Sequence, residues 1–357
     1  MLDKPASLVS GKSSPYYWVN SATIAGGPPR LAIAVRKSVL VNPSPKVPAN
    51  DLIQPFQVER YALRGRLVRL GAAADDILSR HAYPEPVAVM LGEMMAVAAI
   101  LAGALKYDGV FTLQTQGNGP IRLMVADITS TGDMRAYAQY DAERLAALAA
   151  TMPDGVVSDS VPHLLGTGYL AFTVDQGPDT ERYQGIVDLD GATLADCLHH
   201  YFRQSEQIDA AIKVAVSRQD AGAGASAEPR GRWQVAAMMV QRLPKAHAVD
   251  EEEREEGWRE AVILMGSATN RELLDPTLHP DALLYRLFHE PGVRVYKPMA
   301  LRSACRCSSD RVSIMLRSFP KEEIESMKVD DKVVVTCEFC RRTYTYDQGE
   351  IDNLYAG

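Results

Sequence analysis

The chain has 357 residues, a formal net charge of −7 and a hydrophobic content of 46%, values typical of a globular protein long enough for two or three domains. The negative net charge disfavours a protein whose whole surface attracts nucleic acid or anionic lipid, although a local basic patch remains compatible with it. Five cysteines are too few for a secreted scaffold built on disulfides, and four of them form two close pairs, which in a reducing compartment is typical of metal or redox chemistry.

Residues 1–55 differ in composition from the rest of the chain. Basic residues outnumber acidic ones, proline and serine are frequent, and no apolar period of 2 or 3.6 residues is sustained. We therefore predict a disordered extension. A transit peptide and an upstream start assigned by mistake are the alternatives. A secretory signal peptide is disfavoured because the short apolar run carries Arg36 and Lys37.

The first regular elements are predicted between residues 57 and 105. Loose apolar alternation predicts a strand over 57–70, and a short helix follows over 72–81. Residues 87–105 form an apolar run that carries one charge, Glu93, and this helix is long enough to cross a membrane. The carboxylate, the Ala/Met/Val/Gly-rich composition and the few flanking cations favour the central helix of a folded domain instead.

A series of strands with one amphipathic helix follows. Seven strands are predicted, over 110–115, 121–125, 134–140, 168–174, 183–187, 212–216 and 233–240. The first two flank a turn with two glycines and predict a hairpin. Thr193 and Asp196 have the spacing of a capping box at the start of the helix, and Cys197 lies on its apolar face, so we expect a buried, unreactive thiol there.

The charge pattern changes after Leu243. Residues 250–256 are almost all acidic, which predicts the start of a helix because the helix dipole favours negative charge there. Four apolar residues come soon after, Trp258, Val262, Ile263 and Leu264. A further helix is predicted over 281–289. Short amphipathic helices are marginal in isolation, so these two must pack against another part of the molecule.

The two cysteine pairs are the most specific feature of the sequence. Cys305 and Cys307 form a CxC motif, and Cys337 and Cys340 form a CxxC motif between two predicted strands. Four thiolates suit a tetrahedral Zn²⁺, and a closed Cys₄ site is structural rather than hydrolytic. This region has only a small core, so metal binding on the order of 10–16 kcal/mol could decide whether it folds. Two cysteine pairs without a metal are the alternative.

Five arginines surround the cysteines in the sequence: Arg302, Arg306, Arg311, Arg341 and Arg342. Positive charge favours thiolate over thiol and so raises reactivity toward oxidants. The same charge could instead offset the roughly −2 charge of a zinc tetrathiolate, or contact the phosphates of a nucleic acid. Neither a Walker loop nor a G-x-S-x-G or H-E-x-x-H motif occurs in the chain, so no enzyme activity is predicted.

From about Phe56 onward the chain resembles the heat-shock protein 33 family of redox-regulated holdase chaperones. The resemblance rests on the order and spacing of the four cysteines and on four further segments, at 113–120, 181–185, 201–207 and 284–290. The first fifty-odd residues have no counterpart in that family, and the loop over 218–231 is longer than usual. Neither departure involves the cysteines.

The resemblance implies a fold and a mechanism. It implies an N-terminal α+β domain over 56–246 with an antiparallel sheet and packed helices, a metastable helical linker over 247–298, and a small C-terminal zinc domain over 299–357. The reduced, zinc-bound form would be inactive. Oxidation would form the disulfides Cys305–Cys307 and Cys337–Cys340, release zinc, unfold the C-terminal domain and linker, and expose apolar surface that binds unfolding client proteins without ATP.

The resemblance also implies binding partners and a cellular location. Activated members of the family form homodimers in the bacterial cytoplasm, and neither nucleic acid nor a membrane is expected as a partner. The four apolar residues after the acidic run are candidates for contact with clients, with packing in the core as the alternative. Two other functions remain open from the residues alone. One is a zinc ribbon that binds nucleic acid through its arginines, and the other is a thiol–disulfide oxidoreductase that uses Cys337 and Cys340.

Overall fold

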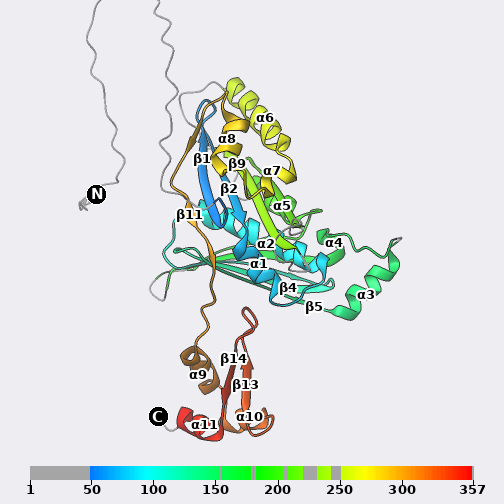
Figure 1. The fold of residues 1–357 in the computed structure, drawn as a ribbon, viewed down its shortest axis with the longest axis vertical. Coiled ribbons are helices and arrows are strands. Elements are labelled where there is room, and N and C mark those ends of the chain that lie inside the picture. The colour runs from blue at the N-terminus through cyan, green and yellow to red at the C-terminus, as the bar shows by residue number, and fades with distance from the viewer. Residues whose placement is uncertain are drawn as a thin grey trace, which may run out of the picture. The chain divides into compact units, whose positions relative to one another are not determined.

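A computed structural model describes residues 49–152, 154–177, 180, 182–204, 208–219, 231–242 and 251–355. Two six-stranded sheets form the larger part of this structure, and a two-stranded hairpin lies near the C-terminus (Figure 1). The α+β class and the antiparallel sheets predicted from the sequence are confirmed. The disordered extension was predicted over residues 1–55, of which residues 1–48 lie outside the described residues.

The first sheet has the strand order β10-β1-β2-β9-β8, with β11 also paired to β1. All of its pairings are antiparallel. Its strands are β1 (Leu52–Val58), β2 (Leu63–Leu70), β8 (Ala210–Gln219), β9 (Arg232–Arg242), β10 (Val293–Val295) and β11 (Met299–Ala300). Residues 52–55, which composition places in the N-terminal extension, therefore belong to this sheet.

The single strand predicted over 57–70 is wrong. The chain turns at residues 59–62, where Ala62 has a φ of 52°, and returns antiparallel as β2. The turn contains neither glycine nor proline, and apolar residues continue on both sides of it. Periodicity alone therefore could not separate the two strands.

The second sheet has the order β12-β5-β4-β3-β6-β7. Its strands are β3 (Val110–Gly117), β4 (Ile121–Thr129), β5 (Asp133–Tyr140), β6 (Gly168–Asp175), β7 (Tyr183–Asp188) and β12 (Arg302–Ser303). The short strand β12 joins the edge strand β5 in parallel, and the other pairings are antiparallel. The seven strands predicted after residue 109 are confirmed.

The central helix α2 (Glu85–Ala104) packs against strands of both sheets, with α1 (Ala72–Ser79) beside it. Among the described residues it is the one helix long and apolar enough to cross a membrane, and 83% of its most apolar window is buried inside the molecule. This burial confirms the prediction of a core helix. The hydrophobic cluster around α2 unites the inner faces of the two sheets.

Three helices lie in the chain between β5 and β8: α3 (Ala142–Thr151), α4 (Val161–Leu164) and α5 (Leu194–Gln204), of which α5 contacts β7 of the second sheet and β8 of the first. The predicted capping box is present before α5, because the Thr193 hydroxyl accepts from the Asp196 amide and the Asp196 carboxylate accepts from the Thr193 amide. Cys197 is fully buried, and this burial raises the pKa of its thiol to about 12. The predicted burial of this thiol is thus confirmed. The sequence did not indicate α3 or α4.

The first sheet is buried on both faces. Along β9, Val235, Ala237 and Met239 face the cluster around α2, whereas Ala236, Met238 and Val240 face a second hydrophobic cluster. That second cluster is completed by helices α6 (Glu251–Ser267), α7 (Asn270–Leu274) and α8 (Pro280–Phe288). Figure 1 shows these helices over the sheet. The two predicted helices of this region are confirmed, and they have the packing partner that their length requires.

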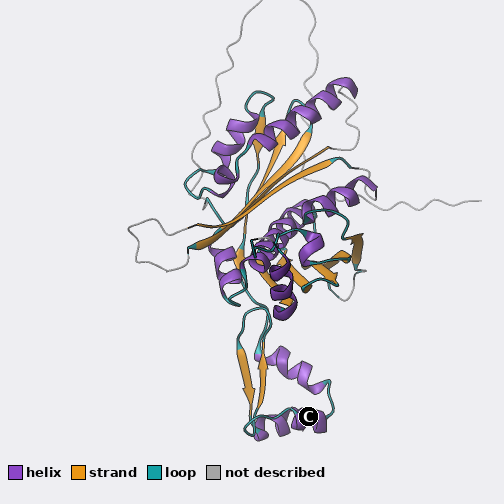
Figure 2. Cartoon of the chain, turned by 90° about the vertical axis from the view of Figure 1, so that its right-hand side faces the viewer, coloured by secondary structure: helices purple, strands orange, loops and turns teal. Residues whose placement is uncertain are grey.

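The C-terminal part contains a third, small hydrophobic cluster, and Figure 2 shows its two-stranded hairpin with helices beside it. Its elements are α9 (Ser309–Arg317), α10 (Lys321–Ser326), β13 (Val333–Thr336), β14 (Thr343–Tyr346) and α11 (Gln348–Tyr355). Six buried residues make up its centre: Val312, Leu316, Ile324, Val333, Tyr346 and Ile351. We call residues 304–355 the cysteine module. The strands just before it, β11 and β12, belong to the two large sheets.

Candidate metal and redox site

The four cysteines predicted as a site lie together in the structure. Cys305 and Cys307 are in the loop between β12 and α9, and Cys337 and Cys340 are in the turn between β13 and β14. The Sγ atoms of Cys305 and Cys337 are 3.7 Å apart, those of Cys307 and Cys340 are 3.3 Å apart, and all four lie within 4.8 Å of one another.

This spacing fits a tetrathiolate metal site. A tetrahedron with Zn–S bonds of about 2.3 Å has S···S edges of about 3.8 Å, close to the separation of Cys305 and Cys337. Each thiol has neighbours from both motifs, so the cluster can present four ligands to one ion. The set is all sulfur and fills four positions, which suits Zn²⁺ in a structural role.

The turn that carries the second pair is held by backbone hydrogen bonds. The amide of Cys337 donates to the Arg342 carbonyl at 2.9 Å, and the amide of Arg341 donates to the Cys337 carbonyl at 2.8 Å. Arg341 has a φ of 58°, in the left-handed region that closes the turn. The thiols of Cys337 and Cys340 are thereby directed to the same side, toward the CxC loop.

Burial and contacts among the four cysteines shift the pKa values of the thiols. Burial raises the pKa of Cys340 to about 12 and also raises that of Cys337. Burial acts in the same sense on Cys305, but hydrogen bonds from Cys307 and the other cysteines outweigh it and lower its pKa to about 7. One thiolate is thus stabilised at the expense of its neighbours. A divalent cation bound among them would favour the thiolate form of these cysteines.

The arginines expected around the site divide into different roles. Arg306 pairs with Asp127 at 2.5 Å and Arg302 pairs with Asp133 at 2.5 Å, so carboxylates of the second sheet already neutralise two of them. Arg311 donates to the Arg306 carbonyl at 2.7 Å. These contacts occupy three of the five guanidinium groups on which the nucleic-acid alternative depends. The oxidoreductase alternative lacks its usual setting, because the CxxC motif lies in a β-hairpin turn rather than at a helix N-terminus.

Two residues near the cysteines were not predicted, Asp127 of β4 and Arg135 of β5. They face each other directly across the hairpin, and their side chains pair at 2.6 Å. A guanidinium nitrogen of Arg135 lies 4.0 Å from the Cys305 Sγ. The strand predicted over 121–125 ended before Asp127, so the sequence did not indicate this pair of opposite charges on neighbouring strands. Its proximity to a motif about 170 residues later in the chain could not be read from the sequence.

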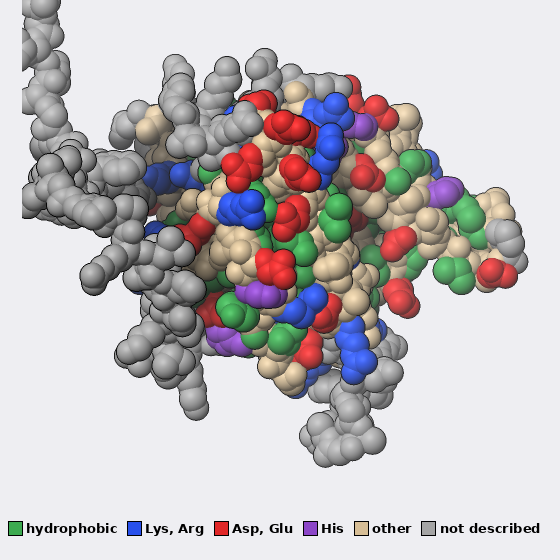
Figure 3. Space-filling model, turned by 90° about the horizontal axis from the view of Figure 1, so that it is seen from above, with side chains coloured by type: hydrophobic (Ala, Val, Ile, Leu, Met, Phe, Trp, Pro, Cys, Tyr) green, Lys and Arg blue, Asp and Glu red, His purple; other side chains and the backbone are tan. Residues whose placement is uncertain are grey.

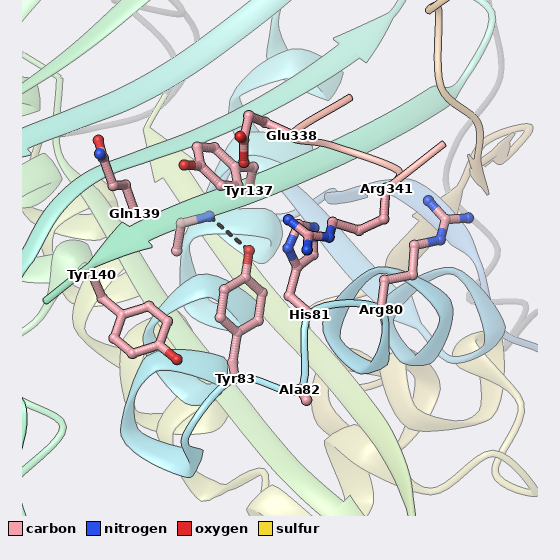
Figure 4. Close-up of a pocket in the computed structure, with 10 residues that line it drawn as sticks. Arg80, His81, Ala82, Tyr83, Tyr137, Gln139, Tyr140, Glu338 and Arg341 are labelled. Carbon is pink, nitrogen blue, oxygen red and sulfur yellow. Dashed lines mark hydrogen bonds between the residues drawn. The ribbon is translucent and has the colours of Figure 1, made fainter. Parts of the chain in front are cut away.

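A polar cavity of about 350 Å³ lies where the CxxC turn meets the second sheet (Figure 4). Its lining comes from the loop before α2, from β5 and from the turn: Arg80, His81, Ala82, Tyr83, Tyr137, Ala138, Gln139, Tyr140, Glu338 and Arg341. The dashed line in Figure 4 is the hydrogen bond from the Ala138 amide to the Tyr83 hydroxyl. Burial and the nearby Arg341 and Arg80 charges lower the pKa of His81, although its hydrogen bond with the Phe339 carbonyl opposes them.

Comparison with known proteins places the chain in a family. The family model described as Hsp33 protein matches residues 51–347. The 33 kDa chaperonin of Caulobacter vibrioides is 41% identical over 299 residues, which cover 84% of this chain and 95% of the relative. The 33 kDa chaperonin of Ectopseudomonas mendocina is 37% identical over 313 residues, which cover 86% and 96%.

The fold agrees with these matches. The crystal structure of the 33 kDa chaperonin of Thermotoga maritima superposes with a TM-score of 0.69 at 24% identity, covering 85% of this chain and 97% of that one. The resemblance drawn from the sequence is confirmed, and with it the prediction of a non-enzymatic chaperone whose four cysteines are consistent with a bound zinc. The chain belongs to the Hsp33 family of holdase chaperones.

Proposed function

We propose that this chain is an ATP-independent holdase with a redox switch made of Cys305, Cys307, Cys337 and Cys340, which hold Zn²⁺ in the reduced, inactive form. The observation that carries the proposal is the convergence of the four Sγ atoms within 4.8 Å. When bound, the metal would supply charge neutralisation and a cross-link between the two motifs. Membership of the family supplies the clients, which are unfolding proteins.

The proposed switch is a pair of two-electron oxidations. With a peroxide as oxidant, one thiolate of a pair attacks a peroxide oxygen and becomes a sulfenic acid; the O–O bond breaks, and the other oxygen leaves as hydroxide or alkoxide. The second thiolate attacks that sulfur and forms the disulfide, and the displaced hydroxide takes up a proton and leaves as water. We propose the pairings Cys305–Cys307 and Cys337–Cys340, which join near neighbours in the chain. Each disulfide removes two ligands from the metal, so both together dismantle the site.

Loss of the metal would unfold the cysteine module because its core is small. Six buried residues form its centre, and this cluster is separate from the two larger ones. We propose the domain boundaries 56–246, 247–298 and 299–357, with β10 as the part of the linker that adds to the first sheet. The chain runs from the linker through β11 and β12 directly into Cys305, so disorder in the module would release these short edge strands first.

The surface offered to clients is proposed to be the second hydrophobic cluster. Trp258, Val262 and Leu264 pack against it in the closed form, whereas Ile263 is already 70% exposed. Undocking of α6 and α8 would uncover these side chains and the sheet face beneath them. Figure 3 views the molecule from the side of α6, where acidic and basic side chains alternate with small apolar patches. Clients would therefore meet a larger apolar area after undocking.

We further propose that the activated form is a homodimer and acts in the cytoplasm. The family supports both points. The apolar face uncovered by the linker offers a surface through which two copies could associate as well as bind clients.

The proposed switch is tested by mapping disulfides after stoichiometric peroxide treatment, using mass spectrometry of alkylated peptides. We expect Cys305–Cys307 and Cys337–Cys340 linkages and one mole of zinc released per chain. The Cys197→Ser variant is the control and should behave as the parent, because Cys197 is fully buried. Linkages between the two motifs would overturn the proposed pairing. A metal that stays bound after all four cysteines are oxidised would overturn the switch.

A further inference from the structure

Asp127 is a buried carboxylate at the junction of the second sheet with the cysteine module. Its side chain is only 5% exposed, and it accepts from Arg135 at 2.7 Å, from Arg306 at 2.5 Å and from the Thr112 hydroxyl at 2.7 Å. Arg135 and Thr112 belong to the same sheet. Arg306 is the residue between Cys305 and Cys307, so one buried carboxylate links the sheet to the centre of the CxC motif.

Other contacts across this junction are also polar or aromatic. The Arg135 guanidinium lies 3.9 Å from the centre of the Phe339 ring, and a His81 ring nitrogen lies 3.4 Å from the Phe339 carbonyl. The amide of Ala304 donates to the Met134 carbonyl of β5, and just before the module the amide of Arg302 donates to the Gly132 carbonyl. None of the three hydrophobic clusters of described residues crosses the junction into the module. A cavity of about 350 Å³ further interrupts the packing there (Figure 4).

Docking of the module therefore depends on few contacts, and Asp127 makes the most buried of them. A buried carboxylate that loses a charged partner becomes strongly unfavourable, so the Arg306 contact is hard to break while the CxC loop keeps its shape. A disulfide between Cys305 and Cys307 would force the loop, and Arg306 within it, into a different conformation. Arg135 would remain paired with Asp127, so the buried carboxylate would keep one charged partner and the second sheet would lose little stability.

We propose that Asp127 acts as a latch, positioning Arg306 and thereby holding the reduced module on the second sheet. The inference rests on the proposed switch, to which it adds a component in the N-terminal domain. Contacts with the second sheet, as well as the chemistry of the thiols, would determine how readily the module is released. Asp127 and Arg135 are positioning residues, and the metal ligands remain the four cysteines.

If Asp127 acted only through its charge, its replacement by asparagine would change the rate of metal loss in the opposite direction to that expected for a latch. Asp127→Asn removes a negative charge close to the thiolates. If charge alone mattered, the thiolates would be more stable and metal loss would be slower. If Asp127 is a latch, the neutral amide binds the arginines more weakly, because charge-assisted hydrogen bonds are about twice as strong as neutral ones. Metal loss would then be faster.

The experiment uses the full chain, reduced and zinc-loaded, without oxidant or client. Hydrogen exchange of the amides of Arg302 and Ala304 reports docking, and zinc transfer to excess EDTA reports the lifetime of the site. We expect Asp127→Asn to accelerate both by about tenfold or more, which corresponds to a loss of about 1.4 kcal/mol. The matched control is Asp133→Asn, which breaks an ion pair with the 71% exposed Arg302 at the same edge and should change either rate by less than about threefold.

A second variant distinguishes loss of the latch from misfolding of the sheet. Arg306→Gln leaves the Asp127–Arg135 pair intact and should accelerate exchange to a similar extent, and the double variant should be no faster than either single one. Unchanged or slower zinc transfer in folded Asp127→Asn, or additive effects in the double variant, would overturn the latch. Because neither oxidant nor client is present, these results are independent of whether oxidation activates the chaperone.

Discussion

At the scale of single residues, Arg69 shows how the first sheet holds the segment around α7. It lies on β2, is 1% exposed, and donates to the carbonyls of Glu272, Asp275 and Leu278 around the end of α7. Burial lowers the pKa of its guanidinium to about 10, still well above neutral. A buried cation thus satisfies three carbonyls that would otherwise lack partners.

Arg69→Met is expected to loosen the linker. Loss of the three hydrogen bonds should destabilise its docking by about 2–4 kcal/mol, so amides of α7 should exchange faster and the reduced protein should protect a client partly without oxidant. Arg64→Met, at an exposed position of the same strand, is the control and should leave both readouts unchanged. Unaltered exchange in α7 of the Arg69 variant would contradict the assigned role.

Glu93 of α2 predicts a pH dependence of stability. Burial, followed by repulsion from Asp159 and Asp196, raises its pKa to about 7, although the amides of Leu194 and Ala195 oppose the shift. The folded state therefore holds this proton more tightly than the unfolded state does. Its contribution is complete below the unfolded pKa of about 4.5 and is lost as the pH rises through 7.

The free energy of unfolding of the N-terminal domain should accordingly fall by up to about 3 kcal/mol between pH 4.5 and pH 8 because of this group. Glu93→Gln should remove that part of the slope and raise stability at pH 8. Urea unfolding at several pH values measures the difference. A slope identical in the parent and the variant would show that Glu93 does not keep its proton at neutral pH.

At the scale of elements, a glycine allows α6 to pack closely against the first sheet. A Cβ atom on Gly257 would lie 2.2 Å from the ring of Tyr61, whereas one on Gly266 of the same helix would meet nothing within 4 Å. Tyr61 also donates a hydrogen bond from its hydroxyl to Glu260 of α6. The approach of the helix to the sheet therefore depends on the missing side chain at position 257.

Gly257→Ala should weaken the docking of α6 by about 1–3 kcal/mol through overpacking, and so lower the peroxide concentration needed for half-maximal client protection. Gly266→Ala should be neutral or stabilising by about 0.5–1 kcal/mol, because alanine favours the helix more than glycine does. The two peroxide titrations are compared directly. Equal midpoints would show that the fit of α6 does not control activation.

The sequence predicted elements with strong local signals and missed those that depend on distant partners. Glu93 and the apolar run around it identified the core helix, and the capping residues located the start of α5. The two- and three-residue strands β10, β11 and β12 have no periodicity of their own and exist because β1 and β5 offer free edges. The turn at residues 59–62 was missed because it lacks glycine and proline.

The same division holds for the site. The four cysteines were predicted from their spacing because metal chemistry constrains residue types directly. Asp127 and Arg135 were missed because a buried charge in a strand has meaning only when its partner is known. Arg302 and Arg306 were identified by number, but their pairing with carboxylates of the second sheet required the tertiary structure.

At the scale of the whole molecule, three separate hydrophobic clusters give the chain parts of unequal stability. The cluster around α2 is the largest, the second cluster is shared between the first sheet and helices α6, α7 and α8, and the cysteine module has the smallest. If the metal that stabilises the smallest part is lost, this part can unfold while the two large sheets remain folded. Such a hierarchy allows local unfolding to uncover apolar surface without loss of the whole fold.

The most direct test follows zinc release and suppression of aggregation together. Reduced, zinc-loaded protein is treated with peroxide under mild heat in the presence of a thermally unfolding client, with a zinc reporter in the same sample. The account predicts that zinc appears first, that client aggregation then falls, and that reductant with zinc reverses both changes. Retention of zinc during protection, or release of zinc with no gain in protection, would contradict it.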